Sequence, residues 1–136
     1  MTDILHRISN QFLARQIYQA ILSASGLSKW WTKEVRTTSQ VVLLNSVLVL
    51  RLQKCPLINL YSTNALSGPD EWINTHLFFD LTAERNNTIL RFGQKDWKSA
   101  SDFYCHCNTK WSYFLHSLKS YIETGQGTPF LDDVKI

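Results

Sequence analysis

The sequence predicts an α+β domain in which one long C-terminal helix lies across an antiparallel sheet. Three observations carry this prediction. Apolar residues recur at helical spacing near the C-terminus, and before them they alternate with polar residues as in a half-buried strand. The length of 136 residues is typical of one domain. We therefore expect residues 1–136 to form a single domain.

The N-terminal part combines one strand with short helices. Residues 4–9 predict a strand that places Ile4 and Ile8 on one side. Apolar residues then follow helical spacing over residues 13–24, and Gly26 stands where a C′ glycine would end the helix. Residues 27–31 predict a short second helix or a turn.

The middle of the chain is rich in Val and Leu. Residues 41–52 predict either two buried strands joined by a tight turn or one strand with a bulge, and periodicity does not distinguish them. Pro56 ends this stretch, and residues 57–61 predict another short strand. Residues 55–66 show no clear hairpin pattern, and residues 67–70 predict a turn.

A hairpin is predicted next. The alternation from Ile73 to Leu81 predicts one strand, and residues 88–94 predict its partner. Asn86 and Asn87 are expected to form the turn, since asparagine tolerates positive φ. This pairing directs four apolar side chains to the core: Leu77, Phe79, Leu90 and Phe92.

The last element is an amphipathic helix of about six turns that ends at Gly125. Its apolar positions fall within an arc of about 120° at the helical period. They are Phe103, Tyr104, Cys107, Trp111, Phe114, Leu115, Leu118, Tyr121 and Ile122. Such a face needs a sheet or another helix to cover it.

Charge and composition exclude several classes of partner. The 14 Lys and Arg are scattered rather than clustered, which argues against nucleic acid. The most apolar window, residues 41–50, is far shorter than the ~20 residues of a membrane span. Three cysteines cannot complete a disulfide framework, and the N-terminus lacks a secretory pattern. We expect a cytoplasmic protein.

The candidate chemical motifs favour structural roles. Cys105 and Cys107 project about 160° apart on a helix, so they cannot share a metal ion or a disulfide. The histidines and carboxylates form no spaced catalytic set, and residues 125–127 follow a helix as a cap rather than as a phosphate loop. We expect no metal, no cofactor and no catalytic constellation.

Trp30 and Trp31 are adjacent, so their side chains point in different directions. One is expected to be buried between the short helix and the sheet. The other is expected at the rim of a cavity or at an interaction patch.

Four stretches in the same order resemble the START-like (SRPBCC) superfamily, in the branch related to heat-shock-protein ATPase activators. The first is GLSKWWT, residues 26–32. The others are residues 70–81, residues 87–92 and residues 110–130. Together the four stretches, in register, extend over about three quarters of the chain.

The resemblance implies a helix-grip fold, in which a curved antiparallel sheet wraps around the C-terminal helix and encloses an apolar cavity. Members of the superfamily mostly bind hydrophobic small molecules; some are protein-binding activators and some are enzymes. The stretch between residues 52 and 72 is shorter than in such relatives. That difference leaves open whether the sheet is complete and the cavity closed.

The expected function is non-enzymatic binding of a small hydrophobic or aromatic ligand between the sheet and the C-terminal helix. The alternative is a protein-binding module such as a chaperone ATPase regulator, as a monomer or a homodimer. Thr75, Tyr113 or Gln94 are expected to orient the ligand. The predicted ligand-binding residues are Trp31, Thr75, Leu77, Phe79, Leu90, Phe92, Phe103, Cys107, Trp111 and Phe114.

Overall fold

The computed structural model describes residues 2–11, 14–37, 41–44, 48–55, 60–67 and 69–136. For Leu22 and for residues 36–37, 41–44, 48–55 and 60–67 it describes the backbone alone. The elements in chain order are β1 (Thr2–Asn10), α1 (Ala14–Leu22), α2 (Ala24–Trp30), β2 (Val35–Thr37), β3 (Val41–Leu44), β4 (Leu48–Cys55), β5 (Leu60–Ser67), the 3-10 turn η1 (Asp70–Trp72), β6 (His76–Glu84), β7 (Asn87–Trp97) and α3 (Asp102–Thr124).

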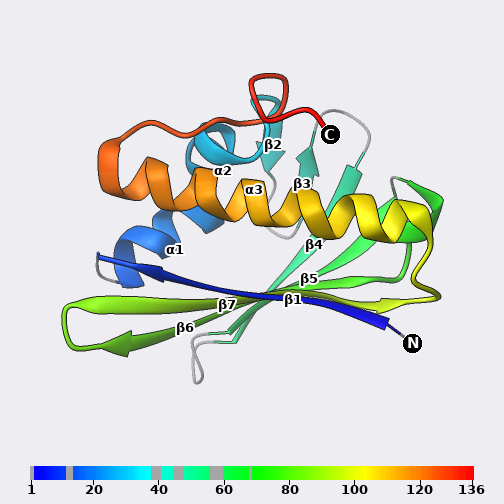
Figure 1. Cartoon of the computed structure of the whole chain (residues 1–136), viewed down its shortest axis with the longest axis horizontal. Helices are drawn as coiled ribbons and strands as arrows, with labels where there is room; N and C mark the ends of the chain where they lie inside the picture. Colours follow the sequence, from blue (N-terminus) through cyan, green and yellow to red (C-terminus); the bar gives the residue numbers. More distant parts are fainter. Residues whose placement is uncertain (1, 12–13, 38–40, 45–47, 56–59, 68) are drawn as a thin grey trace.

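The strands form one seven-stranded sheet in the order β1-β7-β6-β5-β4-β3-β2, with every neighbouring pair antiparallel. Figure 1 shows α1, α2 and α3 on one face of this sheet, with the long α3 running nearly parallel to β1 and β7 in this view. The α+β class and the helix-grip arrangement are thereby confirmed.

The Val- and Leu-rich stretch forms two strands rather than one. β3 and β4 pair antiparallel, with Val41 opposite Arg51 and Leu44 opposite Leu48. The first of the two alternatives left open by the sequence therefore holds. The expected turn at Asn45 and Ser46 lies outside the described residues.

The sheet continues through the segment that shows no hairpin pattern. β5 pairs with β4 on one side and with β6 on the other, so the sheet is unbroken from β1 to β2. The sequence expectation for residues 55–66 was wrong because β5, LYSTNALS, shows no alternation of apolar and polar residues and has Thr63 as its single β-branched residue. Residues 56–59 lie outside the described residues.

Gly26 does not end the first helix. The hydroxyl of Ser23 caps α2 by accepting a hydrogen bond from the Gly26 amide at 2.8 Å, so Gly26 lies inside α2. A Cβ at Gly26 would lie 2.5 Å from the Gln19 carbonyl oxygen and 2.6 Å from the Cα of Ala20. The glycine is therefore required by the close approach of α2 to α1.

The β6–β7 hairpin buries the four side chains predicted for it. Leu77, Phe79, Leu90 and Phe92 are each at most 3% exposed. The predicted turn residues are shifted by one position. Glu84 pairs with Asn87, and the positive φ of 53° is at Arg85.

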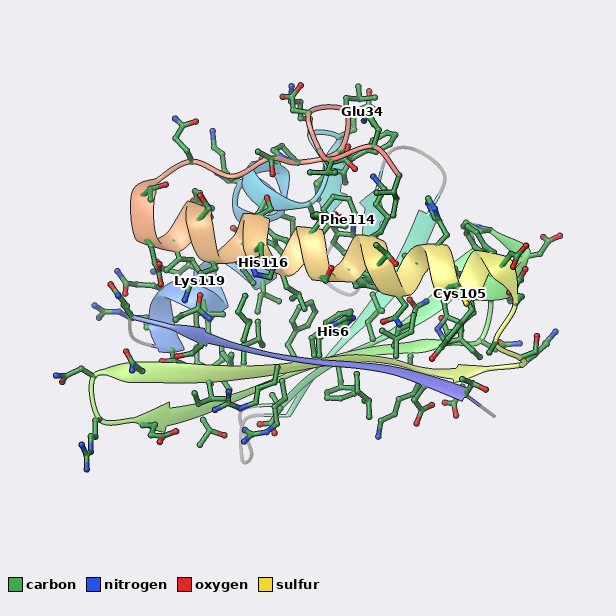
Figure 2. The ribbon with its side chains drawn as sticks, in the orientation of Figure 1. His6, Glu34, Cys105, Phe114, His116 and Lys119 are labelled. Atoms are coloured by element: carbon green, nitrogen blue, oxygen red, sulfur yellow. The ribbon has the colours of Figure 1, made fainter. Side chains whose placement is uncertain are left out.

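α3 is capped at both ends, by Ser101 at its N-terminus and by Gly125 at its C-terminus. The Ser101 hydroxyl accepts a hydrogen bond from the Tyr104 amide, and Gly125 adopts a φ of 83° with its N–H bonded to the Tyr121 carbonyl. The side chain of Lys119 donates to the Ser9 carbonyl and ties α3 to the edge strand β1 (Figure 2). The predicted helix and its terminating glycine are confirmed.

The substitution Gly26→Ala tests the close approach of the two helices. We expect a loss of about 1–3 kcal/mol in the free energy of unfolding, because the added methyl group would overlap backbone atoms that cannot rotate away. Urea denaturation measures the change. Ser25→Ala, an exposed position in the same helix, is the control and should change stability by less than about 0.5 kcal/mol. Equal effects of the two substitutions would contradict the packing role of Gly26.

Candidate functional site

Trp111 of α3 is the centre of a group of aromatic rings between the helix and the sheet. Its ring centroid lies 4.3 Å from that of Phe92 on β7, 5.0 Å from Trp31 and 6.0 Å from Trp72. Phe79 extends the group, with its centroid 5.1 Å from that of Phe92. These spacings are those of rings in contact. Side chains thus occupy the space between β6, β7 and this part of α3.

Both tryptophans of the pair at the end of α2 belong to this core. Trp30 is fully buried and Trp31 is 7% exposed, with ring centroids 5.8 Å apart. The Trp30 indole N–H donates to the Ala20 carbonyl at 2.9 Å. One of them was expected at the rim of a cavity or at an interaction patch; Trp31 is buried like Trp30 but does line the pocket described below, where the C-terminal end of the chain folds back over it.

A chain of buried hydrogen bonds fixes the aromatic group. The Trp111 indole N–H donates to Oε1 of Gln94 at 2.9 Å, and Nε2 of Gln94 donates to the Thr75 hydroxyl at 2.9 Å. That hydroxyl in turn donates to the Trp72 carbonyl at 2.6 Å. The side chains of Gln94 and Thr75, predicted to orient a ligand, bond to the protein instead. Tyr113, predicted for the same role, is 39% exposed.

A pocket of about 200 Å³ opens beside the aromatic group, along the N-terminal half of α3. Its walls come from the end of α2, from η1, from α3 and from the C-terminal segment. The lining residues are Trp31, Trp72, Phe103, His106, Cys107, Lys110, Trp111, Phe114 and Phe130.

The structure divides the ten predicted ligand residues into two groups. Five line the pocket: Trp31, Phe103, Cys107, Trp111 and Phe114. The other five lie in the core between the sheet and α3, each at most 3% exposed, and do not line it: Thr75, Leu77, Phe79, Leu90 and Phe92.

Sequence reasoning missed four lining residues. His106 and Lys110 occur at helical spacing with Phe103, Cys107 and Trp111, so the stripe itself could have indicated them. Trp72 and Phe130 are brought in from distant parts of the chain, and local pattern gives no signal for them.

The last nine residues, 128–136, form a segment that we call the C-terminal strap. The amide of Thr128 donates to the Ser117 hydroxyl at 2.8 Å, and the amide of Phe130 donates to the Trp31 carbonyl at 2.6 Å. Phe130 also forms a parallel bridge with Thr32. The strap therefore lies across α3 and the end of α2, and its Phe130 ring closes one side of the pocket. Figure 2 shows Phe114 on the part of α3 beneath it.

A buried carboxylate holds the far end of the strap. The side chain of Asp133 is 2% exposed and pairs with Lys110 of α3 and, at 2.9 Å, with Lys135. Burial raises the pKa of Asp133, but hydrogen bonds and charge from Lys110 and Lys135 outweigh it, so the pKa lies below its ordinary value. Lys110 also donates to the Val134 carbonyl at 2.7 Å. The Lys110 ammonium is therefore engaged by the strap.

The thiol in the pocket is held neutral. Burial raises the pKa of Cys107 to about 11, although the Trp72 indole N–H donates to its sulfur at 3.3 Å. Cys105 is exposed on another side of α3, as predicted (Figure 2). Among the described residues, no three His, Cys, Asp or Glu side chains are grouped so as to hold a metal ion.

The described helices include none that is both long and apolar enough to cross a membrane.

No family model and no curated protein matches this chain. Several solved structures do match it. The solution structure of an Aha1 dimer from Colwellia psychrerythraea is 32% identical with a TM-score of 0.83, and the match covers 93% of this chain and 100% of that one.

Two further structures show the fold alone. Protein MLL2253 from Mesorhizobium loti matches at a TM-score of 0.77 and 12% identity, over 90% of this chain and 97% of its own. Protein SSP2350 from Staphylococcus saprophyticus matches at a TM-score of 0.74 and 15% identity, over 93% of this chain and 95% of its own.

The buried carboxylate of Asp133 makes the free energy of unfolding decrease at low pH. Its pKa is lowered in the folded state, so its contribution is complete above the ordinary carboxyl pKa of about 4 and is lost as the pH falls further. We expect Asp133→Asn to cost about 1–3 kcal/mol of unfolding free energy at pH 7 and clearly less at pH 3, by urea denaturation.

The neighbouring residue gives the matched control for this substitution. Asp132 pairs with Lys33 at 2.6 Å, but its side chain is 61% exposed. Asp132→Asn should therefore cost less than about 1 kcal/mol at pH 7. Equal losses for the two variants, or a loss for Asp133→Asn that does not shrink in acid, would contradict the role of the buried pair.

The two cysteines of α3 should differ in reactivity. At pH 8 a thiol with a pKa of about 11 is thiolate in about one molecule in a thousand, and Cys107 is also buried. Iodoacetamide should alkylate Cys105 in the native protein and Cys107 only after unfolding. Tandem mass spectrometry of the tryptic peptide of residues 99–110 separates the two sites. Modification of both at similar rates in the native protein would contradict this assignment.

Proposed function

The chain belongs to the Aha1-related branch of the START-like superfamily, and we propose that it is a non-enzymatic domain that binds a small apolar or aromatic molecule. The Colwellia psychrerythraea relative supports the family, since it is 32% identical over its entire length. The proposed site is the pocket beside α3. We place this function in the cytoplasm, because three cysteines cannot pair completely and Cys105 and Cys107 are free thiols.

The observation that carries the proposal is the aromatic lining of the pocket. Six of its nine lining residues are aromatic: Trp31, Trp72, Phe103, Trp111, Phe114 and Phe130. Faces and edges of aromatic rings favour a flat, apolar ligand, which gains free energy mainly by leaving water. The pocket is smaller than the ~300–1,000 Å³ typical of drug-sized ligands, so a molecule of one or two rings fits it best.

The polar groups at the pocket are few. Lys110 is occupied by Asp133 and the Val134 carbonyl, and Cys107 is a neutral thiol that accepts from Trp72. His106 is exposed, with its ring stacked beside that of Phe103 at 6.2 Å between centroids. A ligand with one polar substituent would direct it toward His106 and solvent. The aromatic lining would then supply the affinity, and His106 at the pocket opening would orient the ligand.

The second candidate is a protein-binding module, such as a chaperone ATPase regulator or a homodimer. It is supported by the relative, whose solution structure is that of an Aha1 dimer. The strap also exposes apolar side chains, Leu131 by 66% and Val134 by 48%. Sedimentation velocity tests the homodimer, because a homodimer requires a mass near twice 15.8 kDa.

Isothermal titration calorimetry with 2-naphthol, a flat two-ring molecule, tests the proposed pocket. We expect binding by the wild-type chain and a loss of about tenfold in affinity for Phe103→Ala, which removes one wall. Phe103 is partly exposed, so this variant should fold. Phe130→Ala should weaken binding similarly from the opposite side of the pocket.

Phe79→Leu is the control, because Phe79 is a core residue that does not line the pocket. Its affinity for 2-naphthol should stay within about twofold of the wild type. Failure of the wild-type chain to bind would refute the proposal. A larger loss of affinity for Phe79→Leu than for Phe103→Ala would instead indicate that the ligand binds between the sheet and α3.

A further inference from the structure

A turn in the C-terminal strap presents a leucine side chain to solvent. The Asp132 amide donates to the Pro129 carbonyl at 2.9 Å, so residues 129–132 form a turn with Leu131 as its third residue. The Leu131 side chain is 66% exposed, the largest fraction among the exposed large apolar residues of the described chain. Figure 1 shows the strap, drawn in red, on the side of α2 and α3 that faces away from the sheet. The strap thus carries an apolar side chain at an outer surface of the protein.

The backbone of Leu131 is strained. Its φ is 82°, in the left-handed region that turns fill with Gly or Asn. The described residues include three other non-glycine positions with positive φ, and all three are polar: Asn74, Arg85 and Asp96. Asparagine and aspartate tolerate this region through local hydrogen bonds, whereas leucine has no such compensation. Strain and exposure both act against a leucine whose only role is to complete the turn.

The pocket beside α3 matches this side chain in size and polarity. Its volume is about 200 Å³, and six of its nine lining residues are aromatic. A cavity of roughly 150 Å³ with apolar walls holds benzene, which has more carbon atoms than the leucine side chain. Lys110 and Cys107 of the lining already bond within the protein, and His106 is exposed at the opening. A leucine side chain can therefore enter without leaving a buried polar group unpaired.

The leucine and the pocket are neighbours on the surface. Phe130 forms one wall of the pocket, and Leu131 follows it in the chain but does not line the pocket. A projection and a hollow on the same patch are the elements of a closed, isologous dimer, because a two-fold axis places each projection in the hollow of the other copy. A second copy of the chain is therefore the partner that would bury both Leu131 side chains and fill both pockets at once.

We propose that two copies of the chain associate about a two-fold axis, with Leu131 of each inserted into the pocket beside α3 of the other. Val134, 48% exposed on the same strap, would add apolar area at this interface. The proposal rests on the homodimer named as the second candidate function and specifies its interface. A small apolar ligand would compete with Leu131 for the pocket, so ligand binding would dissociate the dimer.

Sedimentation equilibrium over a concentration series tests the proposal on the full chain. We expect a mass of about twice 15.8 kDa for the associated wild type. Leu131→Gly should raise the dimer dissociation constant at least about tenfold, because two leucines lose their burial at once. The control is Leu5→Ala, since Leu5 is a similarly exposed leucine, at 62%, on the strand β1. Its dissociation constant should remain within about twofold of the wild type.

The urea midpoint of the monomer separates a role in docking from a role in folding. Glycine adopts a φ of 82° without strain, so Leu131→Gly should unfold at a urea concentration no lower than that of the wild type. Both chains are measured at a dilution where the wild type is monomeric. A lower midpoint for Leu131→Gly would overturn the proposal, because the leucine would then support the fold of the single chain.

The pocket side of the interface has its own test. Phe103→Ala removes one pocket wall and should raise the dimer dissociation constant about fivefold. Saturating 2-naphthol should shift the wild type toward monomer. If 2-naphthol binds and leaves the dimer unchanged, the shared pocket is overturned. Failure of 2-naphthol to bind would refute the ligand alone, because the dependence of the dimer on Leu131 and Phe103 is measured without it.

Two outcomes of the concentration series contradict the proposed interface outright. One is a wild type that stays monomeric throughout the series, which would leave Leu131 to a different protein. The other is a dimer that Leu131→Gly leaves intact, which would place the interface elsewhere on the chain.

Discussion

The position of α3 depends on how the indole of Trp111 is buried. An unpaired buried donor costs about 1–3 kcal/mol, so a hydrogen-bond acceptor for the Trp111 N–H stabilises the burial of this ring between helix and sheet. Gln94 of β7 supplies that acceptor, and its own amide N–H continues to Thr75 and so to the Trp72 carbonyl. One chain of hydrogen bonds therefore sets the distance between α3 and the sheet and brings Trp72 to the helix.

This constraint also decides where a ligand can go. With the rings of Trp111, Phe92 and Phe79 in contact, the space over β6 and β7 is occupied by the protein itself. The described pocket is displaced to the side of α3 where Trp72 and the C-terminal strap supply the outer walls. Closure there depends on Phe130 and on the buried pair of Asp133 and Lys110.

The sequence predicted the elements whose signals are local. Helical spacing and the terminating Gly125 located α3, and strict alternation located β6 and β7. The sequence-based prediction failed where contacts between distant residues determine the structure. Gly26 is required by the close approach of α1, and β5 is a strand because of its neighbours rather than its composition. Half of the predicted site residues line the pocket, because a stripe on α3 shows which face is apolar but not which part of it other rings cover.

The most direct measurement is the position of bound 2-naphthol by intermolecular nuclear Overhauser effects in the wild-type protein. We expect contacts from the ligand protons to the rings of Phe103 and Phe130, and none to the methyl groups of Leu77 and Leu90. Contacts to those methyl groups would contradict it, because they would require the ligand to enter between the sheet and α3, where the aromatic rings now pack.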